Sequence, residues 1–448
     1  MDDNDKKELS SWLQYFLVGG SVFAMHFGGS SMVWPMTWGK ESGNQMFLAF
    51  LGIFITSLFL VFMGYLSLVK SNRSMLSMAR QVSNKFAIIL GMMVMLVLGP
   101  LFGVPRMSAA AWDAILQVSK FKPANIWPAL IFSAVYYLIT YWFISEKTGI
   151  VDKLGKILLP VLIVSVTVII IKGIVNPIGP QMAPEYDINP FAYGFKSGYA
   201  TAEILCALIF GDIIINGLKS KGIGKEYLNK NLKIVCVIGI ALLTFTHFGH
   251  MLLGSFAGSL GDLKYSALYT EVVLKLWGQV GGIIFNIALV FAALTTAVGM
   301  SAGSAELLSE ISKNKISYKK SAIFILIVSA IISTTGLTTI VEIIGPLLDI
   351  VYPAAIVMVL YYALVPNLDN KPRILSSYRV ATFIALTWGI VEGIVTYGHI
   401  FNFKVDWLEK FIEKVPGASL NLSWLTIVII SAVITMLLYR NKEEASTN

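Results

Sequence analysis

The amino-acid sequence predicts an all-α polytopic membrane protein with about twelve transmembrane helices, and two observations lead to this prediction. First, 56% of the 448 residues are hydrophobic and only 13% are charged, whereas soluble domains average about 45–50% and about 25%. Second, the chain contains many apolar stretches of the ~20 residues that a helix needs to cross a bilayer. Together they exclude a disordered chain, a collagen-like fibre and an ordinary soluble enzyme.

The apolar stretches predict the positions of the helices. We expect twelve spans, near 11–36, 45–69, 86–116, 126–144, 152–174, 191–219, 231–257, 272–309, 318–334, 338–364, 376–398 and 423–440. The segment before the first span, MDDNDKKELS, is polar and acidic and lacks the basic and short apolar regions of a signal peptide.

The distribution of Lys and Arg predicts the orientation. If the N-terminus is inside, 23 of the 34 Lys and Arg residues fall in inside segments and 10 fall in outside loops, while Arg106 lies within a span. We therefore expect a multi-pass protein of the cell (inner or plasma) membrane with both termini cytoplasmic. The net charge of +8 is explained by this topology and by the lipid surface, and it does not indicate nucleic acid.

Motif searches argue against an enzyme. Cys206 and Cys236 lie in apolar segments without CxxC spacing, so we expect core residues and neither a disulfide framework nor a metal site. The stretch 299–303 matches G-x-S-x-G, but it lies inside an apolar helix and not in the strand–turn–helix context of a nucleophile elbow. Because Walker A and HExxH motifs are also absent, we expect no enzymatic activity and no cofactor.

An internal repeat is indicated by two matches at the same offset of 193 residues. Met107-Ser108-Ala109 recurs as Met300-Ser301-Ala302, and ILLPVLIV (157–164) corresponds to IVYPAAIV (350–357). A five-span shift is odd, so the second copy enters the membrane from the opposite side, as in the inverted repeats of secondary transporters. The expected organisation is an N-tail (1–10), two five-helix repeats (11–174 and 191–364), two added helices (376–440) and a cytoplasmic tail (441–448).

Small and polar residues interrupt the first and sixth spans. The first contains Gly28, Gly29, Ser30 and Ser31 ahead of Pro35, which would let a ligand approach the backbone; the alternative is a Gly/Ser packing patch between helices. Paired breaks in matching repeat positions point to a transporter binding site.

The sixth span contains Gly198, Ala200, Ala202 and Glu203. A carboxylate near membrane depth is costly, which makes Glu203 a functional candidate. The alternative is a structural ion pair or a protonated acid.

Adjacent hydroxyls, Thr295 and Thr296, lie deep in the eighth span. With backbone carbonyls they would form an all-oxygen site for a small hard cation; alternatively, they bond to carbonyls of their own helix. Arg106 is expected to snorkel or to pair with an acid such as Glu203 or Glu306. His26 could be a satisfied core histidine, a ligand or a proton relay, and the same alternatives hold for His247 and His250 of the seventh span.

In combination, several motifs resemble the branched-chain amino acid:cation symporter family of bacteria. They are FGGSSMVWP (27–35), GPLFGVPR (99–106), GKILLPVLIV (155–164), GYATAEILCALIFG (198–211), LTTAVG (294–299) and YPAAIV (352–357). The resemblance implies the 5+5 inverted-repeat fold of the amino acid–polyamine–organocation superfamily, with discontinuous helices 1 and 6. It also implies sodium-coupled uptake of leucine, isoleucine and valine.

The resemblance also implies site residues. The amino acid would meet the two breaks, which with Glu203 gives the candidate substrate-binding residues Gly28, Gly29, Ser30, Ser31, Gly198, Tyr199, Ala200, Thr201 and Glu203. Sodium would be held by backbone carbonyls and by the two hydroxyls, at Phe23, His26, Ala292, Thr295 and Thr296.

The chain departs from the family pattern at both breaks. Where the family reads close to FFGAGNLIFP, Ser31 replaces Asn, Ser30 replaces Gly and His26 replaces an aromatic residue. In the sixth span GYLTMD becomes GYATAE, with Ala200 and Ala202 in place of bulkier residues, so we expect a larger or differently shaped side-chain cavity.

Other functions fit the same fold. A proton-coupled symporter of another small or hydrophobic amino acid would use Glu203 or His26 to carry the proton, and an exchanger of such amino acids would need no coupling ion. A sensor would bind without flux, and a channel would never accumulate its substrate against a gradient.

Overall fold

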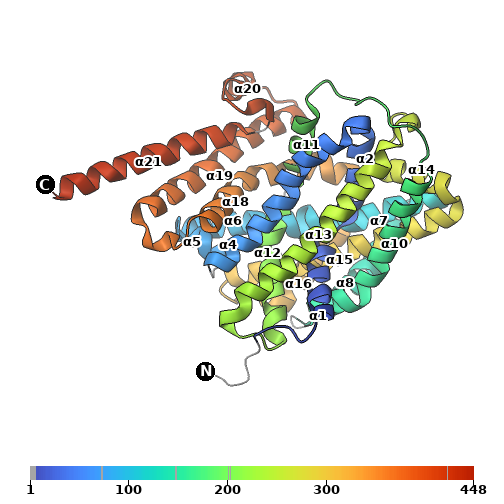
Figure 1. Ribbon diagram of the computed structural model, residues 1–448, viewed down its shortest axis with the longest axis horizontal. Coiled ribbons are helices and arrows are strands. Elements are labelled where there is room, and N and C mark those ends of the chain that lie inside the picture. Colours follow the sequence, from blue (N-terminus) through green and yellow to red (C-terminus); the bar gives the residue numbers. More distant parts are fainter. Residues whose placement is uncertain are drawn as a thin grey trace.

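The computed structural model describes residues 7–71, 74–146, 149–199, 201, 203–420 and 422–447. Within these residues every regular element is helical, and the helices form one bundle (Figure 1). Eight helical runs are long and apolar enough to cross a membrane, or ten if each of two bent helix pairs counts as one span. The predicted all-α polytopic class is confirmed.

The predicted spans of the first half coincide with helices, and four of the five are interrupted. Their bounds are α1 (Trp12–His26) and α2 (Gly29–Ser42); α3 (Met46–Ile53), η2 (Phe54–Phe59) and α4 (Leu60–Ser71); α6 (Asn84–Leu96), η3 (Val97–Leu101) and α7 (Gly103–Ser119); α8 (Trp127–Ile144); and α9 (Ile150–Lys153), η4 (Leu154–Leu158) and α10 (Leu159–Val175). A short helix, α5 (Met75–Arg80), precedes α6.

The remaining spans contain both long straight helices and bent ones. Their bounds are α11 (Pro190–Tyr199) and α12 (Glu203–Ser220); α13 (Leu228–Ser255); α15 (Gln279–Ile311); α16 (Tyr318–Ser333); α17 (Leu337–Thr339), η7 (Ile340–Ile344) and α18 (Pro346–Leu364); α19 (Pro372–Phe401); and α21 (Ser423–Thr447). The polar stretch before α21 contains α20 (Asp406–Glu413), at the end of the bundle opposite the N-terminus (Figure 1).

One predicted span is wrong in extent. The stretch 272–309 is not one helix, because α14 (Tyr265–Trp277) ends inside it and α15 begins at Gln279. Gly278 separates them with φ of +61°, and its N–H donates to the Leu274 carbonyl, 2.7 Å away. Glycine adopts this left-handed conformation without steric cost. A single glycine barely changes the hydrophobicity of the stretch, so the apolar pattern alone did not indicate the break.

Both predicted discontinuous helices are confirmed. In the first span α1 ends at His26, and Gly28 is extended, with φ of −86° and ψ of −179°, before α2 begins. In the sixth span α11 ends at Tyr199 and α12 begins at Glu203, and the two helices are inclined by 44°.

Glycines bring the backbone of the first span against α13. A Cβ atom on Gly39 would lie 2.0 Å from the Met251 carbonyl oxygen, and one on Gly254 would lie 2.0 Å from the Met36 carbonyl oxygen. Nearer the N-terminus, a Cβ atom on Gly239 would lie 2.8 Å from the carbonyl oxygen of Gly19 in α1. Both halves of the first span therefore pack backbone to backbone on one continuous helix.

The sixth span is held by the second span in the same way. A Cβ atom on Gly194 of α11 would lie 1.8 Å from the Ala49 carbonyl oxygen of α3, and one on Gly64 of α4 would lie 2.9 Å from the Ala207 side chain of α12. The π-helical turn η2 joins α3 to α4. The second span therefore follows the bend of the sixth with a turn of π-helix, a feature found at functional sites.

Candidate functional site

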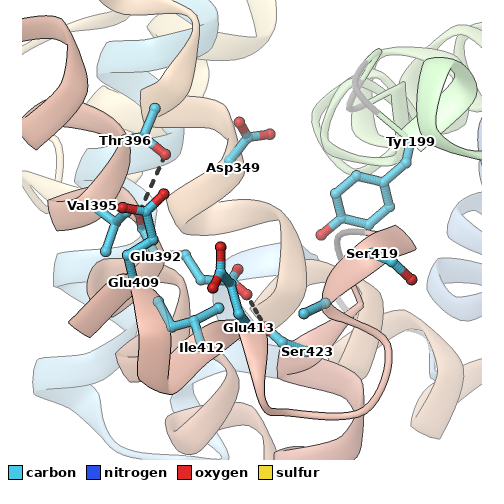
Figure 2. A pocket seen from close by; sticks show the side chains of 11 residues that line it. Tyr199, Asp349, Glu392, Val395, Thr396, Glu409, Ile412, Glu413, Ser419 and Ser423 are labelled. Carbon is cyan, nitrogen blue, oxygen red and sulfur yellow. Dashed lines mark hydrogen bonds between the residues drawn. The ribbon is translucent and has the colours of Figure 1, made fainter. Parts of the chain in front are cut away.

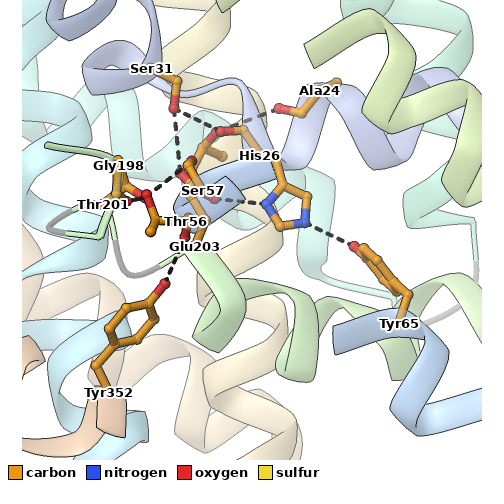
Figure 3. A network of polar contacts seen from close by, with 11 residues as sticks. Ala24, His26, Ser31, Thr56, Ser57, Tyr65, Gly198, Thr201, Glu203 and Tyr352 are labelled. Carbon is orange, nitrogen blue, oxygen red and sulfur yellow. Dashed lines mark hydrogen bonds and ion pairs between the residues drawn. The ribbon is translucent and has the colours of Figure 1, made fainter. Parts of the chain in front are cut away.

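The two helix breaks meet at Glu203, the first residue of α12. Its Oε2 lies 2.7 Å from His26 Nδ1, and its Oε1 lies 3.5 Å from the Ser31 hydroxyl, as Figure 3 shows. Ser31 also donates to the His26 carbonyl oxygen at 3.0 Å. Residues that are far apart in sequence thus surround one carboxylate, with His26 before the first break and Ser31 after it.

His26 is buried and both of its ring nitrogens have partners. Its side chain is 1% exposed, while that of Glu203 is 15% exposed. The second nitrogen, Nε2, lies 3.0 Å from the Tyr65 hydroxyl of α4 (Figure 3), and the Phe210 ring packs edge-on against the imidazole. The sequence did not indicate Tyr65, because nothing in an apolar helix shows which tyrosine faces a distant histidine.

Gly198 and Thr201 face the second span. The Thr201 hydroxyl donates to the Gly198 carbonyl oxygen at 2.7 Å, and its oxygen lies 3.2 Å from the Ser57 hydroxyl oxygen. A Cβ atom on Gly198 would lie 2.3 Å from the Thr56 hydroxyl oxygen. The polar pair Thr56-Ser57 within an apolar span was the signal that could have predicted this contact. Ala200, predicted at the same break, lies outside the described residues.

Tyr199 points away from these residues. Its ring packs edge-on against Tyr352, and it lines a cavity of about 490 Å³ under α20. Figure 2 shows the carboxylates that share this cavity, which belong to Asp349, Glu392, Glu409 and Glu413. Among the predicted residues of the sixth span, Tyr199 therefore lines the cavity under α20, whereas Glu203 contacts the first span and Gly198 and Thr201 face the second.

The glycines of the first break are in close contact with their neighbours. A Cβ atom on Gly28 would lie 2.9 Å from both the Thr296 hydroxyl oxygen and the Met107 sulfur. One on Gly29 would lie 3.3 Å from the Ala110 Cβ. Ser30 is buried in the first turn of α2. The extended backbone of this break thus lies between α7 and α15.

Among the predicted cation ligands, Thr296 of α15 reaches the backbone of α1. The Thr296 hydroxyl lies 3.4 Å from the carbonyl oxygen of Ala24, not that of Phe23 or His26. The Phe23 carbonyl instead accepts the Phe27 N–H at 2.8 Å, and the His26 carbonyl accepts the Ser31 hydroxyl and a backbone N–H. Both predicted carbonyls are therefore engaged within the first span.

The two hydroxyls of the eighth span differ in their contacts. Thr295 donates to the Ala292 carbonyl oxygen at 2.8 Å, the own-helix bond that was one alternative. Thr296 reaches across to α1. Both side chains are buried. Each hydroxyl thus has one carbonyl oxygen nearby, and oxygen atoms of these two kinds are ligands that hard cations bind.

His247 and His250 are buried histidines that bond to carbonyls of their own helix. His247 Nδ1 lies 2.9 Å from the Leu243 carbonyl oxygen, and His250 Nδ1 lies 2.6 Å from that of Thr246. His250 Nε2 also contacts the Tyr269 hydroxyl at 2.8 Å. The two cysteines are buried free thiols.

Comparisons with known proteins identify the family of the chain. Residues 12–442 match the family model described as branched-chain amino acid transport protein. The chain belongs to this family. It is 26% identical to the branched-chain amino acid permease BraB of Bacillus subtilis over 428 residues, 93% of this chain and 94% of the permease. It is also 26% identical to a putative branched-chain amino acid carrier protein of Staphylococcus haemolyticus over 439 residues, 94% and 95% of the two chains.

Solved structures share the family's fold. The chain resembles Mhp1, a nucleobase-cation-symport-1 family transporter, with a TM-score of 0.61, 14% identity and coverage of 98% and 95%. It resembles a Na+-coupled sialic acid symporter with a TM-score of 0.56, 14% identity and coverage of 95% and 90%. At these identities the likeness concerns the fold. Because the family and its relatives are transporters, this protein is a membrane transporter and not an enzyme.

Proposed function

We propose that the protein is a sodium-coupled symporter that imports hydrophobic amino acids, leucine, isoleucine and valine among them, by alternating access. The observation that carries the proposal is the meeting of the two broken spans at Glu203, beside a hydroxyl of α15 that contacts a carbonyl of α1. Broken helices at membrane depth bind substrate and coupling ion in secondary transporters, and family membership names the substrate class.

The substrate's ammonium group would face the Glu203 carboxylate and the Ser31 hydroxyl. The side-chain-free Gly28 and Gly29 expose backbone beside them, and the first turn of α2 leaves amide groups without helical partners. We propose that Ser30, Gly198, Thr201 and the small residues of the sixth span shape the remaining space. The substrate would then bridge the two repeats, 11–174 and 191–364.

Sodium would bind between α1 and α15. Its ligands would be the Ala24 and Ala292 carbonyls and the hydroxyls of Thr295 and Thr296, a set in which Ala24 takes the place expected for Phe23. Because a bound ion ties α1 to α15 next to the first break, ion binding and substrate binding would strengthen each other, and linkage makes this coupling reciprocal.

Uptake of radiolabelled leucine into proteoliposomes, with and without an inward sodium gradient, tests the function. We expect accumulation above equilibrium only with the gradient. The double variant Thr295→Ala, Thr296→Ala should retain its fold but lose sodium activation. A matched control removes two hydroxyls that bond only within α13, Thr244→Ala with Thr246→Ala. Sodium activation that persists in the first double variant would eliminate the proposed ion site.

A second function, proton-coupled transport or exchange, is favoured by the buried pair of His26 and Glu203, 2.7 Å apart. Protonation of this pair would switch its charge during the cycle. Uptake that follows a pH gradient, ignores sodium and is abolished by His26→Phe would support it, whereas wild-type pH dependence in that variant would reject it.

A further inference from the structure

Arg106 is a buried cation that forms no ion pair within 4.0 Å among the described residues. The residue is 6% exposed, and neither Nε nor Nη1 has a hydrogen-bond partner. Among the ion pairs of the described residues none involves it. An unpaired buried charge is costly, and ionisable groups at membrane depth mark functional sites.

The two acids that the sequence offered as partners are engaged elsewhere. Glu203 directs its two oxygens at His26 and Ser31. Glu306 lines a separate cavity together with Lys219 and Tyr318. Arg106 therefore keeps its capacity to bind an anion.

Aromatic rings hold the guanidinium in place. Its Cζ atom lies 4.3 Å from the centre of the Phe102 ring and 5.2 Å from that of Trp34. Such contacts stabilise a cation, and they leave Nε and Nη1 without a hydrogen-bond acceptor. The planar fork of arginine donors matches a carboxylate in a bidentate manner.

The neighbours of Arg106 line a cavity on one side and contact the first break on the other. Phe102 and Trp34 line a cavity of about 470 Å³. The next residue of α7, Met107, contacts the Gly28 backbone position. Arg106 lies in the first turn of α7, where the helix dipole also favours an anion.

We propose that Arg106 binds the carboxylate of the transported amino acid, so that the zwitterion lies between the guanidinium and the Glu203 carboxylate. The inference rests on the proposed function only in taking a free amino acid as the cargo. It adds that the transporter selects for a free carboxylate and rejects amides, esters and amines of the same side chain.

Binding to the detergent-purified full-length protein tests the proposal. Thermal-shift titrations compare leucine with leucinamide, and each other amino acid with its amide. We expect the wild type to bind the acid tightly and the amide weakly. Arg106→Gln should weaken binding of the acid by between about 10- and 150-fold, the range for hydrogen bonds to charged groups, and leave binding of the amide unchanged.

A matched control removes a buried cation that already has a partner. Lys40 has a side chain that is 1% exposed, and its Nζ lies 2.6 Å from Glu185 Oε1, so Lys40→Gln should leave the ratio of acid to amide affinity unchanged. Arg106→Lys keeps the charge but loses the fork, and it should lower the acid affinity by about 10-fold. If Arg106→Gln does not fold, the Arg106→Lys variant still tests whether Arg106 binds the carboxylate.

The outcomes separate the two proposals. A wild-type ratio in a folded Arg106→Gln or Arg106→Lys variant, with leucine still bound, overturns the role of Arg106 and leaves the proposed function standing. If another amino acid binds in place of leucine, isoleucine and valine, the proposed substrates are wrong, and the role of Arg106 is judged on that amino acid. If the wild type binds none of them, both proposals fail.

Discussion

Replacing Gly28 with alanine perturbs the proposed ion site by a single methyl group. Gly28 has φ of −86°, which any residue can adopt, so the backbone is not strained. The methyl carbon would lie 2.9 Å from the Thr296 hydroxyl oxygen and from the Met107 sulfur. The flexible methionine can move aside, whereas the short, branched threonine side chain has few alternatives.

The size of the effect follows from these contacts. Ordinary contact begins near 3.4 Å, so the Thr296 oxygen must retreat by about 0.5 Å. This oxygen already lies 3.4 Å from the Ala24 carbonyl oxygen, and the shift pulls the two proposed ligands apart. We expect the sodium concentration for half-maximal leucine uptake to rise about 10-fold, which corresponds to about 1.4 kcal/mol. Overpacking costs an additional 1–3 kcal/mol, roughly, in stability.

The neighbouring glycine is the control. A methyl on Gly29 would meet only apolar atoms, the closest being the Ala110 Cβ at 3.3 Å, and would not touch Thr296. The assay is sodium-dependent uptake in proteoliposomes, with thermal unfolding to show that both variants fold. Equal sodium dependence in folded Gly28→Ala and Gly29→Ala would refute the placement of sodium beside Thr296.

Three further predictions follow from features outside the ion site. Lys264→Met removes an ion pair with Glu41 at 2.7 Å. The hydrogen bond and charge of Glu41 raise the pKa of Lys264, so the pair stabilises the fold below the unfolded lysine's pKa of about 10.4, and this stability is lost as the pH rises through the raised value. Because Lys264 is 51% exposed, we expect a difference in unfolding free energy of at most about 1 kcal/mol at pH 7 and none at strongly alkaline pH. Gly194→Ala would place a methyl 1.8 Å from a backbone oxygen of α3, and it should abolish folded expression, measured by size-exclusion chromatography. In a cysteine-free background, an impermeant maleimide added to intact cells should label Lys410→Cys but not Lys225→Cys; the reverse labelling would show that the predicted orientation is wrong.

The sequence was sufficient to predict the class of fold and the first helix break. Long apolar runs are visible without knowledge of tertiary structure, and the pair Gly28-Gly29 interrupts one of them with residues that favour an exposed backbone. The division of the stretch 272–309 was not predictable, because a single glycine in an apolar run is compatible with a continuous helix as well as with the left-handed turn at Gly278.

The candidate site residues could be chosen from the sequence by residue type, but the backbone carbonyl that faces Thr296 could not. Polar side chains such as Glu203 and Thr296 stand out in apolar spans. A backbone carbonyl, by contrast, exists at every residue, and the rotation of α1 decides that Ala24 and not Phe23 faces Thr296. The link from His26 to Tyr65 depends on how distant spans pack, which one sequence does not reveal.

The glycine contacts along α13 determine which parts of the molecule can move independently. Both α1 and α2 pack closely on this one helix of 28 residues, which therefore spans the first break. The first break is therefore supported on both sides by the same helix, which restricts bending at Gly28. The sixth span is supported differently. Its first half, α11, packs on α3, and its second half, α12, packs on α4, and the π-helical turn η2 joins α3 to α4. The two halves of the proposed site therefore rest on different supports, one continuous helix behind the first span and two helices joined by η2 behind the sixth.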